Sequence, residues 1–232
     1  PNACPHCGPH VWLLNSRGEE IISEDPIKTT VKLLEQGKII AVKGLGGFHL
    51  MCDARDMQVV EKLREIKKRP DKPLALMIED VDTVKQYCHL NRKEKAVLEG
   101  NKRSIILLNK KGEKIERNLA ENIAPGIKYF GVMLPYTPLH HLLFDGKLKA
   151  LVATSANISG DSIEYKNESA FKNLKNIADY FLFHNREIYL PIDDSVVRFI
   201  LGKERLTRRA RGYVPLPIKV NGLADGLAVG GQ

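Results

Sequence analysis

Four cationic side chains fall within six residues of the stretch "IKKRPDKPLALM", at Lys67, Lys68, Arg69 and Lys72. Cations in the last turn of a helix complement the helix dipole, worth about 0.3–1 kcal/mol each, and they need no ligand for that. A proline corner between a helix and a strand can also aim several charges at one polyphosphate. The residue types alone leave both interpretations open.

A second polar cluster follows the apolar run in "LVATSANISG", residues 151–160. Residues 152–154 are expected to form a buried strand that leads directly into Ser155 and Asn157. Ligands bind at the carboxyl ends of strands in open α/β sheets, and small polar residues let a ligand approach the backbone there. The alternative is a turn in which Ser and Asn satisfy only their own backbone.

Basic residues return late in the chain, in "RLTRRARGYVP". Alternate side chains of a strand point to opposite faces, so Arg209 and Arg211 would share a face if the strand extends that far. Just upstream, "LPIDDSVVRF" places Asp193, Asp194 and Ser195 before an expected strand. These three could contact Mg²⁺ or a ribose, although capping of a turn is the favoured role for the two acids.

The N-terminal "ACPHCGP" holds Cys4 and Cys7 in a C-x-x-C spacing. This spacing followed by Gly-Pro forms a tight turn that lets both sulfurs reach one tetrahedral Zn²⁺, but a structural zinc site needs four ligands. His6 and His10 could contribute. The favoured hypothesis makes the two cysteines the last pair of a zinc site whose partners precede Pro1, and a redox or inconsequential pair is the alternative.

Other catalytic motifs are missing from the sequence. The glycine-rich "KGLGGFH" meets neither the P-loop nor the dinucleotide pattern. No nucleophile triad is recognisable, and the histidines in apolar contexts are expected to be core or surface residues: His49, His140, His141 and His184.

The composition predicts a folded protein with an anionic partner. The 232 residues are 43% hydrophobic, and 36 Lys and Arg against 28 Asp and Glu give a net charge of +8. No apolar run approaches the roughly 20 residues of a membrane helix, and the four cysteines do not suggest a secreted disulfide framework. We therefore expect a cytoplasmic protein with no membrane partner.

Alternating helix and strand patterns predict an α/β fold with a twisted mixed β-sheet flanked by helices. Expected helices run from Pro26 to before Gly37, from about Asp56 to Lys68, and near 79–88, 92–99, 137–144 and 167–175. Expected strands lie at 38–42, 73–78, 104–108, 150–154, 181–184, 195–201 and 204–209. We divide the chain into the end of a zinc-finger module plus linker (1–24), a nucleotide-binding domain (25–220) and the start of a following domain (221–232).

Six stretches, taken in order, resemble the YrdC-like domain of the HypF family of hydrogenase maturation carbamoyltransferases: "KGLGGFHLMCDA", "KKRPDKPLALM", "GVMLPYTPLHHLL", "TSANISG", "DDSVVR" and "TRRARGYVP". The match covers about residues 25–220 and implies a YrdC-like fold. "ACPHCGP" is similar to the end of that family's zinc-finger module, and "GLADGLAVGGQ" to the opening of its Kae1-like domain.

The resemblance implies an enzyme that uses ATP with Mg²⁺ and carries Zn²⁺ in its zinc-finger module. This segment would convert carbamate, released from carbamoyl phosphate, to carbamoyl adenylate, for transfer to the C-terminal cysteine of a HypE-like acceptor protein. Lys67, Arg69 and Lys72 would then be the catalytic cations. The implied nucleotide-binding residues are Lys43, Ser155, Asn157, Ser195, Arg198 and Arg209, and the implied metal ligands are Cys4 and Cys7.

Two alternatives remain open. Relatives that make threonylcarbamoyl adenylate for tRNA modification have a Pro-Thr-Glu-Thr type stretch where an ungapped comparison places Lys43–Gly46, and the loss of those hydroxyls argues against threonine. A basic RNA-binding module is the other alternative. Aromatic residues make up only 6% of the chain and do not interleave with the basic runs as stacking platforms would, so a nucleic-acid partner is not expected.

Overall fold

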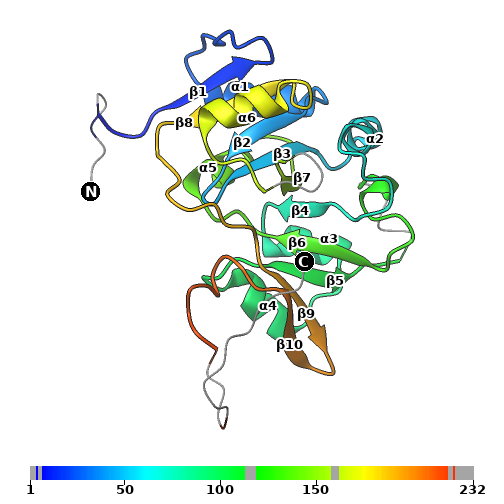
Figure 1. The fold of residues 1–232 in the computed structure, drawn as a ribbon. Coiled ribbons are helices and arrows are strands. Elements are labelled where there is room, and N and C mark those ends of the chain that lie inside the picture. Colours follow the sequence, from blue (N-terminus) through cyan, green and yellow to red (C-terminus); the bar gives the residue numbers. More distant parts are fainter. Residues whose placement is uncertain (1–3, 5–6, 113–118, 158–161, 219–221, 223–232) are drawn as a thin grey trace.

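The computed structural model describes residue 4, residues 7–112, 119–157 and 162–218, and residue 222. These residues form one mixed sheet with helices on both faces (Figure 1). The ten strands lie in the order β1-β8-β2-β3-β7-β4-β6-β5-β9-β10. Their bounds are β1 Val11–Asn15, β2 Ile40–Lys43, β3 Phe48–Asp53, β4 Ala75–Ile78, β5 Ile105–Asn109, β6 Tyr129–Met133, β7 Ala150–Ser155, β8 Tyr180–His184, β9 Val196–Ile200 and β10 Lys203–Arg208.

The sheet combines parallel and antiparallel pairs, as the sequence predicts. The pairs β2/β8, β4/β6 and β5/β9 are parallel, while the other neighbours run antiparallel. Every residue of β2 and β3 is buried. These central strands carry apolar side chains on both faces because helices cover both sides of the sheet.

Two hydrophobic clusters fill the two faces. One takes Leu50 of β3 together with apolar residues of α2, α3, α4 and α6, whereas Met51 of β3 belongs to the other cluster with residues of α1. Leu139 of α5 packs against this second cluster. The helices are α1 Pro26–Glu35, α2 Met57–Ile66, α3 Val81–Tyr87, α4 Arg92–Glu99, α5 Pro138–Leu142 and α6 Asn167–Leu174, with a short 3-10 helix η2 at Glu121–Ile123.

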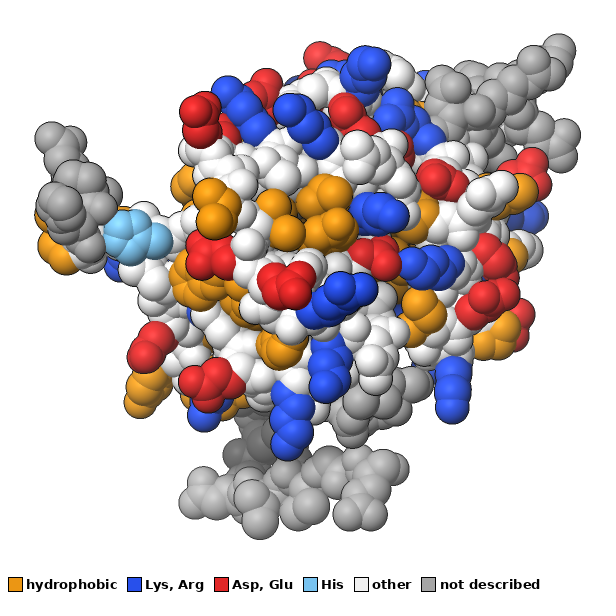
Figure 2. Space-filling view, turned by 90° about the horizontal axis from the view of Figure 1, so that it is seen from above, with side chains coloured by type: hydrophobic (Ala, Val, Ile, Leu, Met, Phe, Trp, Pro, Cys, Tyr) orange, Lys and Arg blue, Asp and Glu red, His pale blue; other side chains and the backbone are white. Residues whose placement is uncertain are grey.

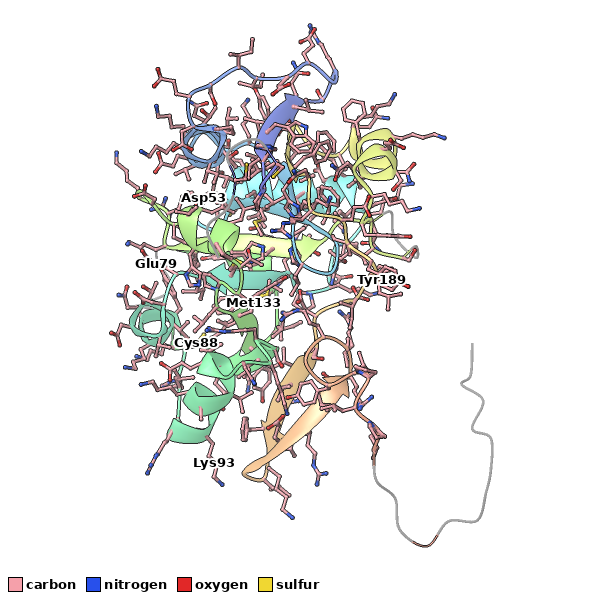
Figure 3. All side chains as sticks on the ribbon, turned by 90° about the vertical axis from the view of Figure 1, so that its left-hand side faces the viewer. Asp53, Glu79, Cys88, Lys93, Met133 and Tyr189 are labelled. Carbon is pink, nitrogen blue, oxygen red and sulfur yellow. The ribbon has the colours of Figure 1, made fainter. Side chains whose placement is uncertain are left out.

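Side-chain caps start the helices where the sequence predicts. The Asp25 carboxylate accepts from the amides of Ile27 and Lys28, and Asp56 caps α2 in the same way. Asn91 and Glu94 form a capping box at α4. At the other end of the molecule, Lys93 of α4 donates to the carbonyl of Gly202 in the β9–β10 turn, and Figure 3 shows this helix beside that hairpin.

Three strands were not expected from the sequence. Strand β1, Val11–Asn15, lies in the segment that the sequence assigned to the zinc-finger module and linker, yet it pairs with β8 along five residues. The division at residue 24 stays a prediction. β3 and β6 were also missed, because fully buried strands lack the alternation that marks a half-buried one. The start of a following domain, assigned to residues 221–232, lies outside the described residues apart from Gly222.

Among the helices in the described part of the chain, none has the length and apolar character needed to cross a bilayer.

Candidate nucleotide site

The cationic corner, residues 67–72, and the Ser-Ala-Asn loop, residues 155–157, meet in the structure, although Lys67 and Ser155 lie 88 residues apart in the sequence. Lys67 ends α2 and its Nζ donates to the carbonyl of Ser155 at 2.5 Å. The same Nζ lies 3.2 Å from Oδ1 of Asn157, which also accepts from the Ser155 hydroxyl at 3.0 Å. β7 is therefore joined at its carboxyl end to the corner that the sequence singled out.

Burial lowers the pKa of two cations in this corner. Lys67 is only 6% exposed, and burial together with the neighbouring Arg69 lowers its pKa to about 8. Burial also lowers the pKa of Arg69, with Arg64 and Arg208 adding repulsion. Arg69 donates to the Thr154 hydroxyl at 3.2 Å and to the Pro73 carbonyl at 3.1 Å.

Two cavities meet at Arg69, Ser155 and Arg208, which line both. The first has a volume of about 420 Å³ and walls that are largely apolar. The second, of about 370 Å³, is cationic. The apolar walls include Leu74, Ile105, Leu107, Ile127, Ala153, Ile163 and Val196. The cationic cavity is lined by Lys67, Lys68, Arg69, Pro70, Asp71, Lys72, Ser155, Asn157 and Arg208.

The cations around these cavities have no carboxylate partner within ion-pair distance. Among the described residues, no salt bridge involves Lys67, Arg69, Lys72, Arg198 or Arg208. Lys67 and Arg69 donate instead to neutral carbonyl, amide and hydroxyl oxygens. Lys67 is the buried member of this group, and because buried charges are normally paired, an uncompensated one beside other cations is typical of an anion-binding site.

The far wall of the apolar cavity comes from β6 and β9. The Arg198 guanidinium lies over the Tyr129 ring at 4.3 Å from its centroid and donates to its hydroxyl. Arg198, one of the expected nucleotide-binding residues, lines the apolar cavity, and the Tyr129 ring holds its side chain there.

Three of the expected nucleotide-binding residues are not brought into these cavities. Ser195 is fully buried, and its hydroxyl donates to the Arg211 carbonyl and accepts from the Ala210 amide. Arg209 donates to the carbonyls of Tyr213 and Leu216. Lys43 donates to the His184 carbonyl and lines a separate pocket of about 510 Å³. Arg208, in contrast, lines both cavities.

Asp194 is the centre of a buried ionic network that the sequence did not predict. One Asp194 oxygen is 3.1 Å from Nε2 of His49, and the other accepts from Nε and Nη2 of Arg211. Burial by itself would raise the pKa of Asp194, but the contacts with His49 and Arg211 hold it well below its usual range. Arg211 lies beyond the end of β10, over the Tyr136 ring, so it shares no strand face with Arg209.

The N-terminal cysteines are both exposed. The Gly8 amide donates to the Cys4 carbonyl at 2.7 Å. Within the described part of the chain, no group of three or more His, Cys, Asp or Glu residues is arranged to hold a metal ion. The expected zinc site stays a prediction.

Residues 32–210 match the family model of Sua5, YciO and YrdC, whose description reads "Telomere recombination". The chain belongs to the Sua5/YciO/YrdC family. This membership agrees with the mixed sheet flanked by helices and with the YrdC-like resemblance of the sequence.

Within the Sua5/YciO/YrdC family, the chain is similar to HypF proteins. It is 50% identical over 205 residues to carbamoyltransferase HypF of Synechocystis sp., covering 88% of this chain and 26% of the relative. A full-length HypF solved in a phosphate- and nucleotide-bound form has a TM-score of 0.87 at 47% identity, over 95% of this chain and 28% of that one. The HypF structure from T. kodakarensis gives a TM-score of 0.89 at 45% identity, over 95% and 29%. The chain thus spans about a quarter of the length of these relatives.

Proposed function

We propose that this chain binds ATP and activates carbamate as carbamoyl adenylate. The observation that supports this best is the unpaired cationic cavity beside a largely apolar one. An apolar cavity with a few polar groups suits a purine base, and several cations from different segments suit a triphosphate. The similarity to a HypF solved with phosphate and nucleotide adds support.

In the proposed reaction, a carbamate oxygen attacks the α-phosphorus of ATP while the bond from that phosphorus to the bridging oxygen breaks. Pyrophosphate leaves with the electrons of the broken bond. The new bond joins the carbamate oxygen to the α-phosphorus, and it links the carbamoyl group to AMP in the adenylate. In this proposal Lys67, Arg69 and Lys72 neutralise the negative charge that develops. No side chain acts as a nucleophile, so the site works by positioning and electrostatics.

ATP would enter as its Mg²⁺ complex. Asp193 is exposed and lines the apolar cavity, whereas both oxygens of Asp194 are already engaged by His49 and Arg211. Asp193 is therefore the carboxylate of this pair that is able to face the metal. Zn²⁺ belongs to a different part of the chain, where Cys4 and Cys7 would supply two ligands.

We further propose that the activity serves carbamoyl transfer in hydrogenase maturation. The named activity of the relatives supports this context. Carbamoyl phosphate would be the source of carbamate, and a HypE-like protein would accept the carbamoyl group. Because the chain covers 26% of the Synechocystis relative, carbamate release and final transfer are assigned to other parts of such a protein.

The test is ATP–pyrophosphate exchange in the purified protein, with carbamate supplied from ammonium bicarbonate. Exchange should require carbamate, should be lost in Lys67→Ala, and should not respond to threonine. Stimulation by threonine would support threonylcarbamoyl adenylate synthesis instead. ATP binding without exchange under any carbamate source would leave the chain only a nucleotide-binding role.

A further inference from the structure

Arg64 lies inside the protein, directly behind the cationic corner. It occupies the last turn of α2 and is 3% exposed. Val60 precedes it by four residues on the same buried face of the helix. A guanidinium on the core side of an amphipathic helix is rare unless it is paired. The described residues nevertheless place no carboxylate within ion-pair distance of Arg64.

Backbone carbonyls take the place of a carboxylate. Nη1 of Arg64 donates to the carbonyls of Arg69 at 2.7 Å, Pro70 at 2.8 Å and Lys72 at 3.2 Å. Nη2 donates to the Ile123 carbonyl at 2.9 Å, and Nε donates to the Asn122 carbonyl. One side chain therefore joins α2 to both the corner and η2.

The direction of these carbonyls decides where the corner's side chains point. With the carbonyls of residues 69, 70 and 72 turned toward Arg64, the side chains of Arg69 and Lys72 line the cationic cavity. Arg64 itself lines neither cavity, so it has no route to a ligand. Its planar fork spreads five N–H donors over three nitrogens, so it can reach the corner and η2 together, whereas an ammonium group has three donors on one nitrogen.

We propose that Arg64 is a positioning residue that fixes the 69–72 corner in its anion-binding form before any ligand arrives. This inference rests on the proposed nucleotide site and deepens it. It separates two roles among the arginines: Arg69 contacts the phosphates, and Arg64 sets the backbone from which Arg69 and Lys72 reach them.

The experiment compares Arg64→Lys with the wild type, using inorganic pyrophosphate as the probe and isothermal titration at a temperature where both proteins are fully folded. Pyrophosphate tests the cationic cavity without the apolar one. The variant should bind about 10- to 100-fold more weakly, the loss expected when charge-assisted hydrogen bonds are misplaced. The matched control is Arg55→Lys, because Arg55 pairs with Asp53 and lines neither cavity. The affinity of this variant for pyrophosphate should stay at the wild-type level.

A purely structural role predicts a different result. In that case Arg64→Lys lowers the thermal midpoint while the folded protein binds pyrophosphate as tightly as the wild type, and the proposal is overturned. No pyrophosphate binding by the wild type overturns it as well. If weaker binding is found but no protein shows carbamate-dependent exchange, the positioning role stands and the proposed reaction fails.

Should Arg64→Lys not fold, the ligand-free wild type supplies a second measurement. Because Nη1 is the nitrogen that donates to the corner carbonyls, a guanidinium bonded to them in advance should give slowly exchanging Nη1–H signals in an ¹⁵N-arginine spectrum, assigned by their loss in Arg64→Gln or by correlation to the backbone. Exchange as fast as that of the exposed arginines would show that the corner is not held before binding, and would overturn the proposal.

Discussion

Lys67 has an ammonium group that is nearly buried and donates to the Ser155 carbonyl and the Asn157 amide oxygen, with no carboxylate at ion-pair distance. Burial of this charge is unfavourable, and it lowers the pKa of Lys67 to about 8. A bound polyphosphate would compensate this charge and raise the pKa again, so binding and protonation of Lys67 are linked.

The first prediction concerns pH. Below pH 8 Lys67 is protonated in the free protein, so ATP affinity should be nearly constant there. Above that pH the free protein loses the proton that the complex retains, and affinity should fall by up to about tenfold per pH unit. Titration calorimetry from pH 6.5 to 9.5 measures this. Lys67→Met should bind weakly and without a break near pH 8, and a wild-type profile equally flat would contradict the linkage.

The second prediction concerns the buried network at Asp194. Asp194→Asn leaves His49 and Arg211 without their anionic partner, and removing one member of a buried ion pair costs about 3–5 kcal/mol. Urea unfolding at pH 7 should report a loss of that size. Asp193→Asn is the matched control, because this exposed carboxylate should change the unfolding free energy by less than about 0.5 kcal/mol.

The same network has a predictable acid response. The folded-state pKa of Asp194 is lowered, so its contribution to stability is complete above the unfolded pKa of about 3.9 and is lost as the pH falls below it. The gap in unfolding free energy between wild type and Asp194→Asn should therefore narrow as the pH is lowered from 5 toward 3. A gap that stays constant over that range would argue against an ionised Asp194.

At the scale of elements, the turn between β2 and β3 contacts the segment 192–194, which contains Asp193 and Asp194. The Ile192 amide donates to the Gly46 carbonyl at 2.9 Å. A Cβ on Gly46 would lie 2.3 Å from the Ile192 carbonyl oxygen, so this position accepts only glycine without a backbone shift. The close approach holds Asp193 and Asp194 against the sheet.

Gly46→Ala should therefore destabilise the protein by about 1–3 kcal/mol, the cost of overpacking at a site that cannot relax. It should also weaken ATP binding, because the shift moves the 192–194 segment at the cavity wall. Gly112→Ala is the control, since a Cβ there meets nothing within 4 Å. Equal unfolding midpoints for the two variants in a thermal scan would show that the turn is more compliant than its geometry indicates.

At the scale of the whole molecule, one sheet reaches from β1 to β10, and the site is formed by strand residues together with the corner that follows α2 and the segment that precedes β9. Tyr189 points outward from the body in Figure 3, consistent with its 93% exposure. On the face seen in Figure 2, Lys and Arg are interspersed with Asp and Glu rather than forming a basic stripe. Lys67, Lys68, Arg69, Lys72 and Arg208 line a single cavity of about 370 Å³, which favours a small anion over a nucleic acid there.

Leu13 tests whether β1 is integral to this sheet. It is fully buried, and it pairs with Leu182 of β8. Leu13→Ala should lower the unfolding free energy by about 2–5 kcal/mol and keep a single unfolding transition. Ile22→Ala, at a position 97% exposed, should change it little. An unfolding free energy for Leu13→Ala equal to that of the wild type would support the expected division at residue 24.

Much of this organisation could be predicted from sequence, because it depends on local signals. Asp25 with Pro26 placed the start of α1 and Pro70 placed the end of α2, whereas a common ligand for the cationic corner and the Ser-Ala-Asn loop was expected from the family resemblance. Arg64 was missed because its partners are backbone carbonyls of the corner and of η2, whose positions no local sequence pattern shows. Arg209 was preferred to Arg208 because the end of β10 is set by pairing with β9, including a register shift near Leu206, which no local pattern encodes.

The contact between Lys67 and Ser155 joins segments 88 residues apart, and this separation also has a kinetic meaning. Such distant segments meet only after much loop-closure entropy has been lost, so the site is expected to form late in folding. A nascent chain would then have no affinity for nucleotide, and only the finished sheet would. Ligand at 100 times its dissociation constant would add about 2.7 kcal/mol to the native state, so that ATP acts on this chain as a selective stabiliser of completed molecules.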